Sequence, residues 1–473
     1  MKKQTLISRR DLVSGAIATG CASLLPSRVL GRAGNLAPSD KANIAFIGIG
    51  NYGSVNLREL ATQNIVAICD VDWRSPSEVP GKSTMAEVVA ENYPQAKRFD
   101  DWRIMLEQSD KSIDSVVVCG ADHSHAAAAL TAMKMGKHVY CDKPLAHSVH
   151  EVRAMMDSAR KHGRQATQTG IVGHASEDVR TIVEWVQDGA IGSVQEIQVF
   201  QSPANNLRRY QSPYEEIAHV NDDIPVPAEV KWDLWLGPAP TRKYNPMYLP
   251  LRWRNWLDFG TGILGDHGPH FIDPVFWALD LGFPETIEAE TDPEYDPKVN
   301  TQTFPRMSIV HYRFPARGTR PAVPLTWYGY ASPPTQKGWD TAKPFPNGGG
   351  VILGSKGTIV YGPVYSSLPG APKQVWLLPE ELNKSYKRPA KTLPRPSSHW
   401  LEWVECARAG TQPSANWQYG GALTQVCLLG NIAIRFKGQM LRFDPKKEKF
   451  TNSESANAMF QRAYRAGWSL PTS

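Results

Sequence analysis

The sequence predicts an α/β protein with an N-terminal doubly wound parallel sheet and a C-terminal α/β domain that holds a large, mostly antiparallel, open sheet. Three observations lead to this fold class. Short apolar runs alternate with helical patterns between residues 42 and 170, as in parallel β–α units. A glycine-rich turn joins the first apolar run to the first helical pattern. From residue 171 onward, strand-like runs follow one another with fewer helices between them, which favours antiparallel pairing.

Residues 1–33 are predicted to be an export signal peptide. They join a basic start and the pair Arg9–Arg10 to a run of apolar and small residues that is too short to span a bilayer. The segment Ser8–Val13 resembles a twin-arginine signal, although two positions around it depart from the commonest pattern. We therefore expect export to the periplasm. Lipid attachment at Cys21 and a frayed N-terminal helix are the alternatives.

Composition excludes two classes of partner. The formal net charge is +6, and the Lys and Arg residues form no long basic run, so a nucleic-acid partner is not expected. Beyond the leader, no apolar run reaches the ~18 residues that a membrane helix needs. Of six cysteines, one lies in the leader, and the odd remainder predicts free thiols.

The first predicted strand covers residues 43–49 and runs into the sequence Gly48-Ile49-Gly50-Asn51-Tyr52-Gly53, after which a helical pattern begins. This is the G-x-G-x-x-G pattern of dinucleotide-binding loops. Gly48 permits the tight turn, Gly50 lets a pyrophosphate approach the backbone, and Gly53 lets the helix pack on the strand. The cofactor contacts expected from this loop are Gly48, Gly50, Asn51, Tyr52 and Gly53.

A second strand at residues 65–69 ends in Asp70, which lies twenty residues after Gly50. At this position a carboxylate binds the adenosine ribose hydroxyls and repels a 2′-phosphate, so NAD is favoured over NADP. Arg74 lies close by in the sequence, and NADP therefore stays an alternative. The other interpretation of Asp70 is a turn or helix-cap residue.

The alternation continues to residue 170, and two later strand ends carry polar residues. Ligands of a doubly wound sheet bind at the carboxyl ends of its strands. Asp122 and His125 follow the strand at 115–119, and Lys143, held by Pro144, follows the strand at 138–141. These three residues are therefore further candidates for cofactor contacts. A solvated surface lysine is the alternative for Lys143. The other predicted elements here are helices at 86–93, 102–106, 125–135 and 149–162, and a strand at 165–169.

In the second domain, the segment after Gly262 predicts a helix that carries polar residues on one face. Asp266 and His270 are four residues apart, so they share this face. A neighbouring carboxylate orients an imidazole and raises its pKa, which suits a general base. Pro269 is awkward in a helix interior and predicts a kinked first turn. A metal bound by Asp266, His267 and His270 and a satisfied core histidine are the alternatives.

The rest of the second domain is predicted as one helix, a series of strands and two final helices. A long Pro- and Asn-rich stretch at 202–230 and a Trp-rich stretch at 232–256 separate the first strand from the polar helix. The predicted helices are 177–188, 397–408 and 421–435, and the predicted strands are 194–200, 286–290, 307–314, 322–330, 351–353, 358–361 and 375–378.

In this order, the glycine motif, the triplet Asp142-Lys143-Pro144 and the Gly-x-x-x-Asp-x-x-x-His segment resemble the glucose–fructose oxidoreductase, inositol dehydrogenase and MocA (Gfo/Idh/MocA) family. The resemblance covers about residues 42–465, and Asp142 departs from the family's usual Glu. It implies a Rossmann domain at 42–170 and a substrate-binding and oligomerisation α+β domain at 171–465. It further implies a homo-oligomer, either a dimer or a tetramer, in which Lys143, Asp266 and His270 form the catalytic group.

The resemblance implies an NAD(P)-dependent oxidoreductase that acts on a sugar, glycoside or polyol hydroxyl. His270 would take the hydroxyl proton as hydride leaves for the nicotinamide, Asp266 would orient His270, and Lys143 would hydrogen-bond the reacting oxygen. Further candidates for sugar contacts are Arg252, Trp253, Trp256 and His125.

Export bears on the chemistry, because no pool of NAD exists outside the cytoplasm for the enzyme to exchange with. The first hypothesis is therefore a tightly held cofactor that returns its hydride to a second sugar. The second, suggested by some relatives, is redox-neutral glycoside cleavage, in which a transient ketone permits elimination, hydration and re-reduction. A non-catalytic sugar-binding protein is the third.

Overall fold

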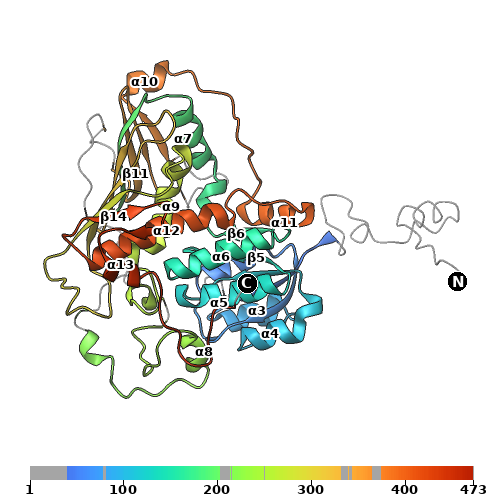
Figure 1. Cartoon of the computed structure of the whole chain (residues 1–473). Coiled ribbons are helices and arrows are strands. Elements are labelled where there is room, and N and C mark those ends of the chain that lie inside the picture. The colour runs from blue at the N-terminus through green and yellow to red at the C-terminus, as the bar shows by residue number, and fades with distance from the viewer. Residues whose placement is uncertain are drawn as a thin grey trace, which may run out of the picture.

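The computed structural model describes residues 40–77, 81–202, 214, 216–249, 251–331, 339, 344–364 and 374–471 (Figure 1). The predicted signal peptide at 1–33, with Cys21, lies outside the described residues, as does part of the Pro- and Asn-rich stretch.

A six-stranded parallel sheet forms the N-terminal part of the chain, which confirms the predicted doubly wound fold. Its order is β3-β2-β1-β4-β5-β6, and every neighbouring pair runs parallel. The order reverses between β1 and β4, and the loops after these strands therefore frame a crevice at the carboxyl edge. The strands are β1 (Asn43–Ile47), β2 (Asn64–Cys69), β3 (Lys97–Phe99), β4 (Ser115–Val118), β5 (His138–Cys141) and β6 (Thr167–Thr169).

Helices cover this sheet, and two of them begin with capping boxes. Thr84 and Glu87 cap α3, and Ser148 and Glu151 cap α6, so that side chains satisfy the first free N–H groups of each helix. The helices are α2 (Tyr52–Glu59), α3 (Met85–Asn92), α4 (Trp102–Ser109), α5 (His125–Lys134) and α6 (Val149–Lys161).

A nine-stranded sheet forms the second layer, and its order is β13-β12-β11-β7-β10-β9-β8-β14-β15. All neighbours pair antiparallel except β7 and β10, which are parallel, so the predicted mostly antiparallel sheet is confirmed. The strands are β7 (Val194–Gln201), β8 (Thr286–Thr291), β9 (Ser308–Phe314), β10 (Val323–Gly329), β11 (Gly348–Gly354), β12 (Thr358–Tyr361), β13 (Val375–Leu378), β14 (Leu441–Asp444) and β15 (Lys449–Phe450).

Two long helices, α9 (Gly262–Ala278) and α12 (Trp417–Arg435), pack against each other and against this second sheet (Figure 1). The helix predicted after Gly262 is confirmed, and α9 continues through Pro269 and Pro274. Nearly all of its residues are buried, and this packing outweighs the cost of the two prolines. The remaining helices are α7 (Glu177–Gln187), α8 (Trp232–Leu236), α10 (Glu380–Ser385), α11 (His399–Ala409) and α13 (Glu454–Ala458), with short 3₁₀ turns at Asp110–Ser112, Asp122–Ser124, Val172–Ala175, Glu216–His219 and Arg252–Asn255.

Residues 230–249 and 251–259, called here the aromatic segment, lie against the carboxyl edge of the first sheet. The N–H of Lys231 donates to the carbonyl of Val71 (2.9 Å), and Val230 pairs with Asp72. The segment has its own apolar core, into which Ala121 of the first sheet's edge also packs. Its buried rings are Trp232, Trp235, Tyr244, Tyr248, Trp253, Trp256 and Phe259.

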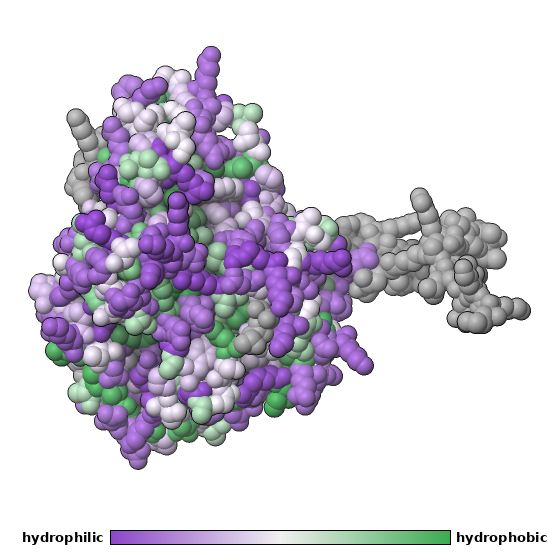
Figure 2. Space-filling view, viewed as in Figure 1, coloured by the Kyte–Doolittle hydropathy of each residue, from purple (hydrophilic) through white to green (hydrophobic). Residues whose placement is uncertain are grey.

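The surface is mixed in character. Hydrophilic residues cover most of the face in Figure 2, and hydrophobic residues occur there in scattered groups. Among the described residues, no helix is both long and apolar enough to cross a membrane. The five cysteines in this part of the chain are free, as predicted: Cys69, Cys119, Cys141, Cys406 and Cys427.

Candidate active site

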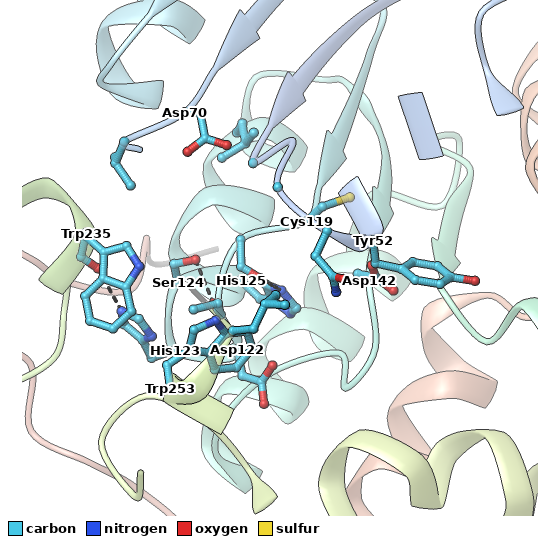
Figure 3. Close-up of a pocket in the computed structure, with 18 of the residues that line it drawn as sticks. Tyr52, Asp70, Cys119, Asp122, His123, Ser124, His125, Asp142, Trp235 and Trp253 are labelled. Carbon is cyan, nitrogen blue, oxygen red and sulfur yellow. Dashed lines mark hydrogen bonds between the residues drawn. The ribbon is translucent and has the colours of Figure 1, made fainter. Parts of the chain in front are cut away.

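A cavity of about 640 Å³ lies at the carboxyl edge of the first sheet, between this sheet, the aromatic segment and α9. Asp70, which follows β2, lies at one end of the cavity. Lys143 lies at the other end, because it follows β5 on the other side of β1, and His270 of α9 lines that end as well. Figure 3 shows Trp235 and Trp253 on one side of this cavity, facing the loop that holds Asp122 and His123.

The glycine loop has the shape that a dinucleotide pyrophosphate requires. Gly48 has a φ of +85°, and a Cβ there would lie 2.8 Å from the carbonyl carbon of Cys119. A Cβ on Gly53 would lie 2.6 Å from the carbonyl oxygen of Gly48, so only glycine lets α2 start so close to β1. Asn51, with a φ of 48°, and Tyr52 begin α2 and line the cavity. The loop therefore fits the cofactor that its motif predicts.

Asp70 ends β2 and faces the adenosine side of the cavity. Its two carboxylate oxygens accept the N–H groups of Ile49 (2.8 Å) and Asp72 (2.9 Å). Burial raises the pKa of Asp70 above its ordinary value, and these two N–H groups oppose that shift. The guanidinium of Arg74 is engaged by Asp72 through two hydrogen bonds of 2.8 and 2.9 Å. This pairing leaves the carboxylate of Asp70 as the group that faces a ribose, which favours NAD.

Lys143 and Asp266 meet at the other end of the cavity, although they are far apart in the sequence. The ammonium of Lys143 pairs with the carboxylate of Asp266 and donates to its carbonyl oxygen (3.0 Å). The second carboxylate oxygen of Asp266 accepts from Nε of Arg254 (3.0 Å). These three side chains are nearly buried, with exposed fractions of 8 to 11%. Asp266 therefore binds two cations at the edge of the cavity.

His270 lines the same end of the cavity, one helical turn after Asp266. The predicted rise in its pKa is wrong: burial lowers the pKa of His270 well below its ordinary value, and the charges of Lys143 and His267 lower it further. Burial, which the spacing of Asp266 and His270 does not show, is the largest cause, and the carboxylate of Asp266 is bound to Lys143 and Arg254. His270 is therefore neutral at neutral pH and able to accept a proton.

Asp122 lines the cavity close to these charged groups. It accepts a hydrogen bond from the hydroxyl of Thr261 (2.6 Å). Burial is the main cause that raises the pKa of Asp122 to about 6; the charge of Asp266 raises it as well, while His125 and Arg254 oppose the shift. A carboxyl group with this pKa changes its charge near neutral pH and can exchange protons with a ligand.

His125 also lines the cavity, but main-chain carbonyls engage its ring. Its Nδ1 lies 2.9 Å from the carbonyl oxygen of Pro144, and its Nε2 lies 3.0 Å from that of Gly120. The ring therefore ties together the two loops that carry Asp122 and Lys143. This engagement argues against the predicted sugar contact through its ring nitrogens.

Asp142, which stands where the resemblance leads one to expect Glu, lies beside Lys143 on the cavity wall. Its carboxylate accepts the N–H of Lys143 (2.9 Å) and lies 3.5 Å from the amide nitrogen of Asn56. Asn56 in turn accepts from the indole of Trp400 (2.6 Å). The shorter side chain is thus part of a buried network that fixes the loop of Lys143.

Only one of the three predicted sugar contacts in the aromatic segment reaches the cavity. Trp253 lines the cavity. Trp256 and Arg252 are not among the described residues that line it. Trp256 is 1% exposed and packs edge-on against Tyr248, with ring centroids 4.8 Å apart. Trp256 is therefore a core residue of the aromatic segment.

Among the cavity-lining residues that the sequence did not indicate are Arg254, Trp235, Trp102 and Trp468. Arg254 lies between the predicted sugar contacts Trp253 and Trp256. Its guanidinium lies 4.5 Å from the centre of the Trp253 ring, and sequence spacing could not show this contact. The alternative of a metal at Asp266, His267 and His270 finds no support. Across the ranges given above, no group of three or more possible metal ligands comes together, and Nδ1 of His267 lies 2.8 Å from Gln201 Oε1.

Comparison with known families gives two matches. A model described as "Oxidoreductase family, NAD-binding Rossmann fold" matches residues 42–170. A second, described as "Oxidoreductase family, C-terminal alpha/beta domain", matches residues 175–313 and 371–470.

Among curated proteins, the chain is similar to an inositol 2-dehydrogenase of Salmonella paratyphi B, with 26% identity over 185 residues, which are 37% of this chain and 52% of that protein. It is also similar to the "Glycosyl hydrolase family 109 protein 1" of Akkermansia muciniphila, with 27% identity over 162 residues, 33% of this chain and 32% of that protein. The chain thus spans about half or less of the length of these relatives.

Among solved structures, the WlbA dehydrogenase of Bordetella pertussis in complex with NADH and UDP-GlcNAcA has a TM-score of 0.55 and 15% identity, covering 85% of this chain and 97% of that one. An aldose-aldose oxidoreductase of Caulobacter crescentus has a TM-score of 0.53 and 17% identity, covering 85% and 100%. At these identities the likeness shows the fold.

Both domain matches follow the order of the two sheets, and the first of them contains the glycine loop and Asp70. The matched residues make up more than half of the chain. The chain therefore belongs to the Gfo/Idh/MocA oxidoreductase family, with an NAD-binding Rossmann domain at its N-terminal side.

Proposed function

We propose that this protein is an NAD-dependent oxidoreductase that oxidises a hydroxyl group of a sugar, glycoside or polyol and holds its cofactor tightly. The observation that carries the proposal is the meeting of Lys143, Asp266 and His270 at one end of the dinucleotide cavity. The names of the similar inositol, aldose and nucleotide-sugar enzymes support this substrate class.

Bound NAD would supply the hydride acceptor at this end of the cavity. The neutral imidazole of His270 takes the proton of the reacting hydroxyl, so that a carbonyl forms as hydride leaves the carbon. The ammonium of Lys143 donates a hydrogen bond to the reacting oxygen. The carboxylate of Asp266 holds that ammonium in place, and Arg254 holds the same carboxylate from its other oxygen. Trp253 offers a ring face to the substrate.

Export to the periplasm through the signal at residues 1–33 is part of the proposal. An exported enzyme has no pool of NAD to draw on, so hydride taken from one substrate returns to a second molecule. A folded, cofactor-loaded enzyme suits the twin-arginine route. We also propose that the chain forms a homo-oligomer, which light scattering of the processed protein would measure.

Redox-neutral cleavage of a glycoside is the second candidate, and two observations favour it. The chain is 27% identical to a protein named as a glycosyl hydrolase. Asp122, with a pKa of about 6, adds a second acid–base group to the cavity besides His270. Elimination next to a transient ketone needs a base for the C–H proton and an acid for the leaving oxygen.

The first test is to denature the exported, processed protein and identify the nucleotide that it releases. Stoichiometric NAD supports retention and a closed hydride cycle. Release of NADP contradicts the role of Asp70, and absence of any nucleotide contradicts tight binding. Sugars and nitrophenyl glycosides then separate the candidates, because aglycone release without net NADH points to cleavage. Lys143→Met should abolish either activity and leave NAD binding intact.

A further inference from the structure

Residues 460–470, called here the C-terminal strap, return to the first domain after the second sheet is complete. In Figure 1 the dark red end of the chain runs beside α8 and finishes over the Rossmann domain. The strap is bound at several points. Arg462 donates to Glu151 of α6 (2.8 Å) and to the carbonyl of His123 (2.6 Å), and Tyr464 donates to Glu151 (2.5 Å).

The middle of the strap is attached to the aromatic segment. Arg465 donates to the carbonyl of Gly237 (2.6 Å) and to the carbonyl and carboxylate of Asp233, both at 2.5 Å. Its own N–H donates to the carbonyl of Pro238 (3.2 Å). These contacts fix the position of the next residues along the chain, which include Trp468.

Trp468 is half-buried and lines the dinucleotide cavity together with Trp102. The two indole centroids are 6.2 Å apart at an angle of 54°, and the guanidinium of Arg103 lies 4.4 Å from the ring of Trp468. The strap thus contributes one aromatic wall of the cavity, and the start of α4 contributes the wall beside it.

This wall lies at the adenosine end. Trp102 follows β3, which is the neighbour of β2, and Asp70 at the end of β2 donates its N–H to the carbonyl of Phe99 (3.1 Å). Lys143 follows β5, on the other side of β1. A dinucleotide whose ribose contacts Asp70 and whose reacting ring approaches Lys143 therefore has its adenine on the side of Trp102.

We propose that Trp468 and Trp102 form the adenine subsite and that the C-terminal strap sets the rate at which NAD leaves. The two indoles contact each other, so the adenine ring lies against the pair and not between them. Bases stack on aromatic side chains because both present π faces. The adenine gives up this stacking surface when the dinucleotide leaves, and Arg465 and Arg462 hold the surface in place.

The proposal deepens the proposed function, since it explains retention of NAD, but it needs no sugar. NAD binding to the full processed chain therefore tests it separately from catalysis. Trp468→Ala should speed NAD dissociation about tenfold, a loss expected for one removed stacking partner. Trp468→Phe should stay close to wild type. Trp376→Ala is the matched control, because Trp376 lies on β13 of the second sheet.

Dissociation is followed by chasing bound NAD with excess ADP-ribose, with thermal melting as a check of folding. Arg465→Ala should also speed release, because it detaches the strap from the aromatic segment. The Trp468→Ala effect should be equal for NAD and ADP-ribose and absent for nicotinamide mononucleotide. Wild-type release from folded Trp468→Ala, or an equal effect on the mononucleotide, overturns the proposal. If wild type itself exchanges NAD quickly, tight retention fails, and the ratio of the dissociation constants still decides on the subsite.

Discussion

The carboxylate of Asp266 lies between two cations, Lys143 and Arg254, and the two cations have different roles. A lone lysine ammonium in a nearly buried place has many orientations, whereas one bound to a carboxylate has few. Arg254 holds that carboxylate from the other side through its Nε. Arg254 is therefore a positioning residue that acts on the reacting oxygen through Asp266 and Lys143.

Replacement of Arg254 by Gln should lower kcat/KM by roughly 10- to 100-fold, because a buried charged contact is lost. The dissociation constant for NAD should stay unchanged. Arg254→Lys should recover part of the rate, since the charge is kept but the planar fork is lost. Arg252→Gln is the neighbouring control and should behave like wild type. A large loss in Arg252→Gln and none in Arg254→Gln would return the sugar contact to Arg252.

Asp122 provides a prediction about pH. Its pKa of about 6 means that the carboxylate gains its charge as the pH rises through 6. An ionised carboxylate favours the cationic, oxidised nicotinamide, so kcat/KM for oxidation should rise through this range. Asp122→Asn should remove the inflection near pH 6. His270 should give no inflection near 6.5, because its pKa lies well below that value. A profile that Asp122→Asn leaves unchanged would assign the inflection to another group.

The residues that sequence could place were those fixed by a local pattern. Gly48 and Asp70 follow from the motif, and the spacing of Asp266 and His270 puts both on one helix. Spacing could not show that Lys143 and Arg254 bind Asp266, because they come from other segments. Spacing also could not show that His270 is buried, and this burial is the main reason why the predicted direction of its pKa was wrong. Trp468 carried no signal, since a strap that returns across two domains has no periodic pattern.

At the scale of elements, apolar runs predicted the buried strands well, and polar or short elements were missed. The strand β3 has the sequence Lys-Arg-Phe and lies at the sheet edge, where exposed polar residues are tolerated. The helix α12 begins at Trp417, before the predicted start at 421, and includes Gly420 and Gly421. Glycine weakens a helix in isolation, so sequence placed the start later. The structure keeps Gly420 because a Cβ there would overlap Thr169.

Comparison of Gly430 with Gly421 in α12 tests this packing argument. A Cβ on Gly430 would overlap the hydroxyl of Tyr312 and lie 2.6 Å from Leu264 on α9. Both side chains are buried, so neither has free space to move into. Gly430→Ala should therefore lower the free energy of unfolding by about 1–3 kcal/mol. A Cβ on Gly421 meets Met156, whose flexible side chain can move.

Gly421→Ala should therefore cost much less, or gain stability from its higher helix propensity. Denaturant unfolding of the two variants measures the difference. Equal effects would show that the contact with Tyr312 does not limit how closely α12 and α9 approach. Because α9 carries Asp266 and His270, Gly430→Ala should also reduce turnover, and Gly421→Ala should not.

At the scale of the whole molecule, folding buries histidines that must stay neutral. Burial lowers the pKa of His123 and of His399 to about 3, against about 6.5 in the unfolded chain. His123 lies between the carbonyl oxygens of Trp235 and Phe259, where the first sheet meets the aromatic segment. His399 begins α11 and packs on Tyr140 of the first sheet. Both histidines lie where separate parts of the chain meet.

The sign of the pH effect follows from these values. The unfolded chain binds protons at these two histidines below pH 6.5, and the folded chain does not, so stability is complete above 6.5 and is lost as the pH falls toward 3. At pH 5 each histidine costs on the order of 2 kcal/mol. Asp122 acts in the opposite direction, because its raised pKa favours the folded form as the pH falls through 6, by about 1.4 kcal/mol at pH 5.

These three groups by themselves should lower the free energy of unfolding on the order of 3 kcal/mol between pH 7.5 and pH 5. Denaturant unfolding at a series of pH values measures it, and His399→Gln should make the fall smaller by about the contribution of one histidine. His219→Gln serves as a control, because that imidazole is 66% exposed and lies away from these buried contacts. A free energy of unfolding that stays constant from pH 7.5 to pH 5 would contradict this prediction. It would mean that His123 and His399 bind protons in the folded state although both are buried.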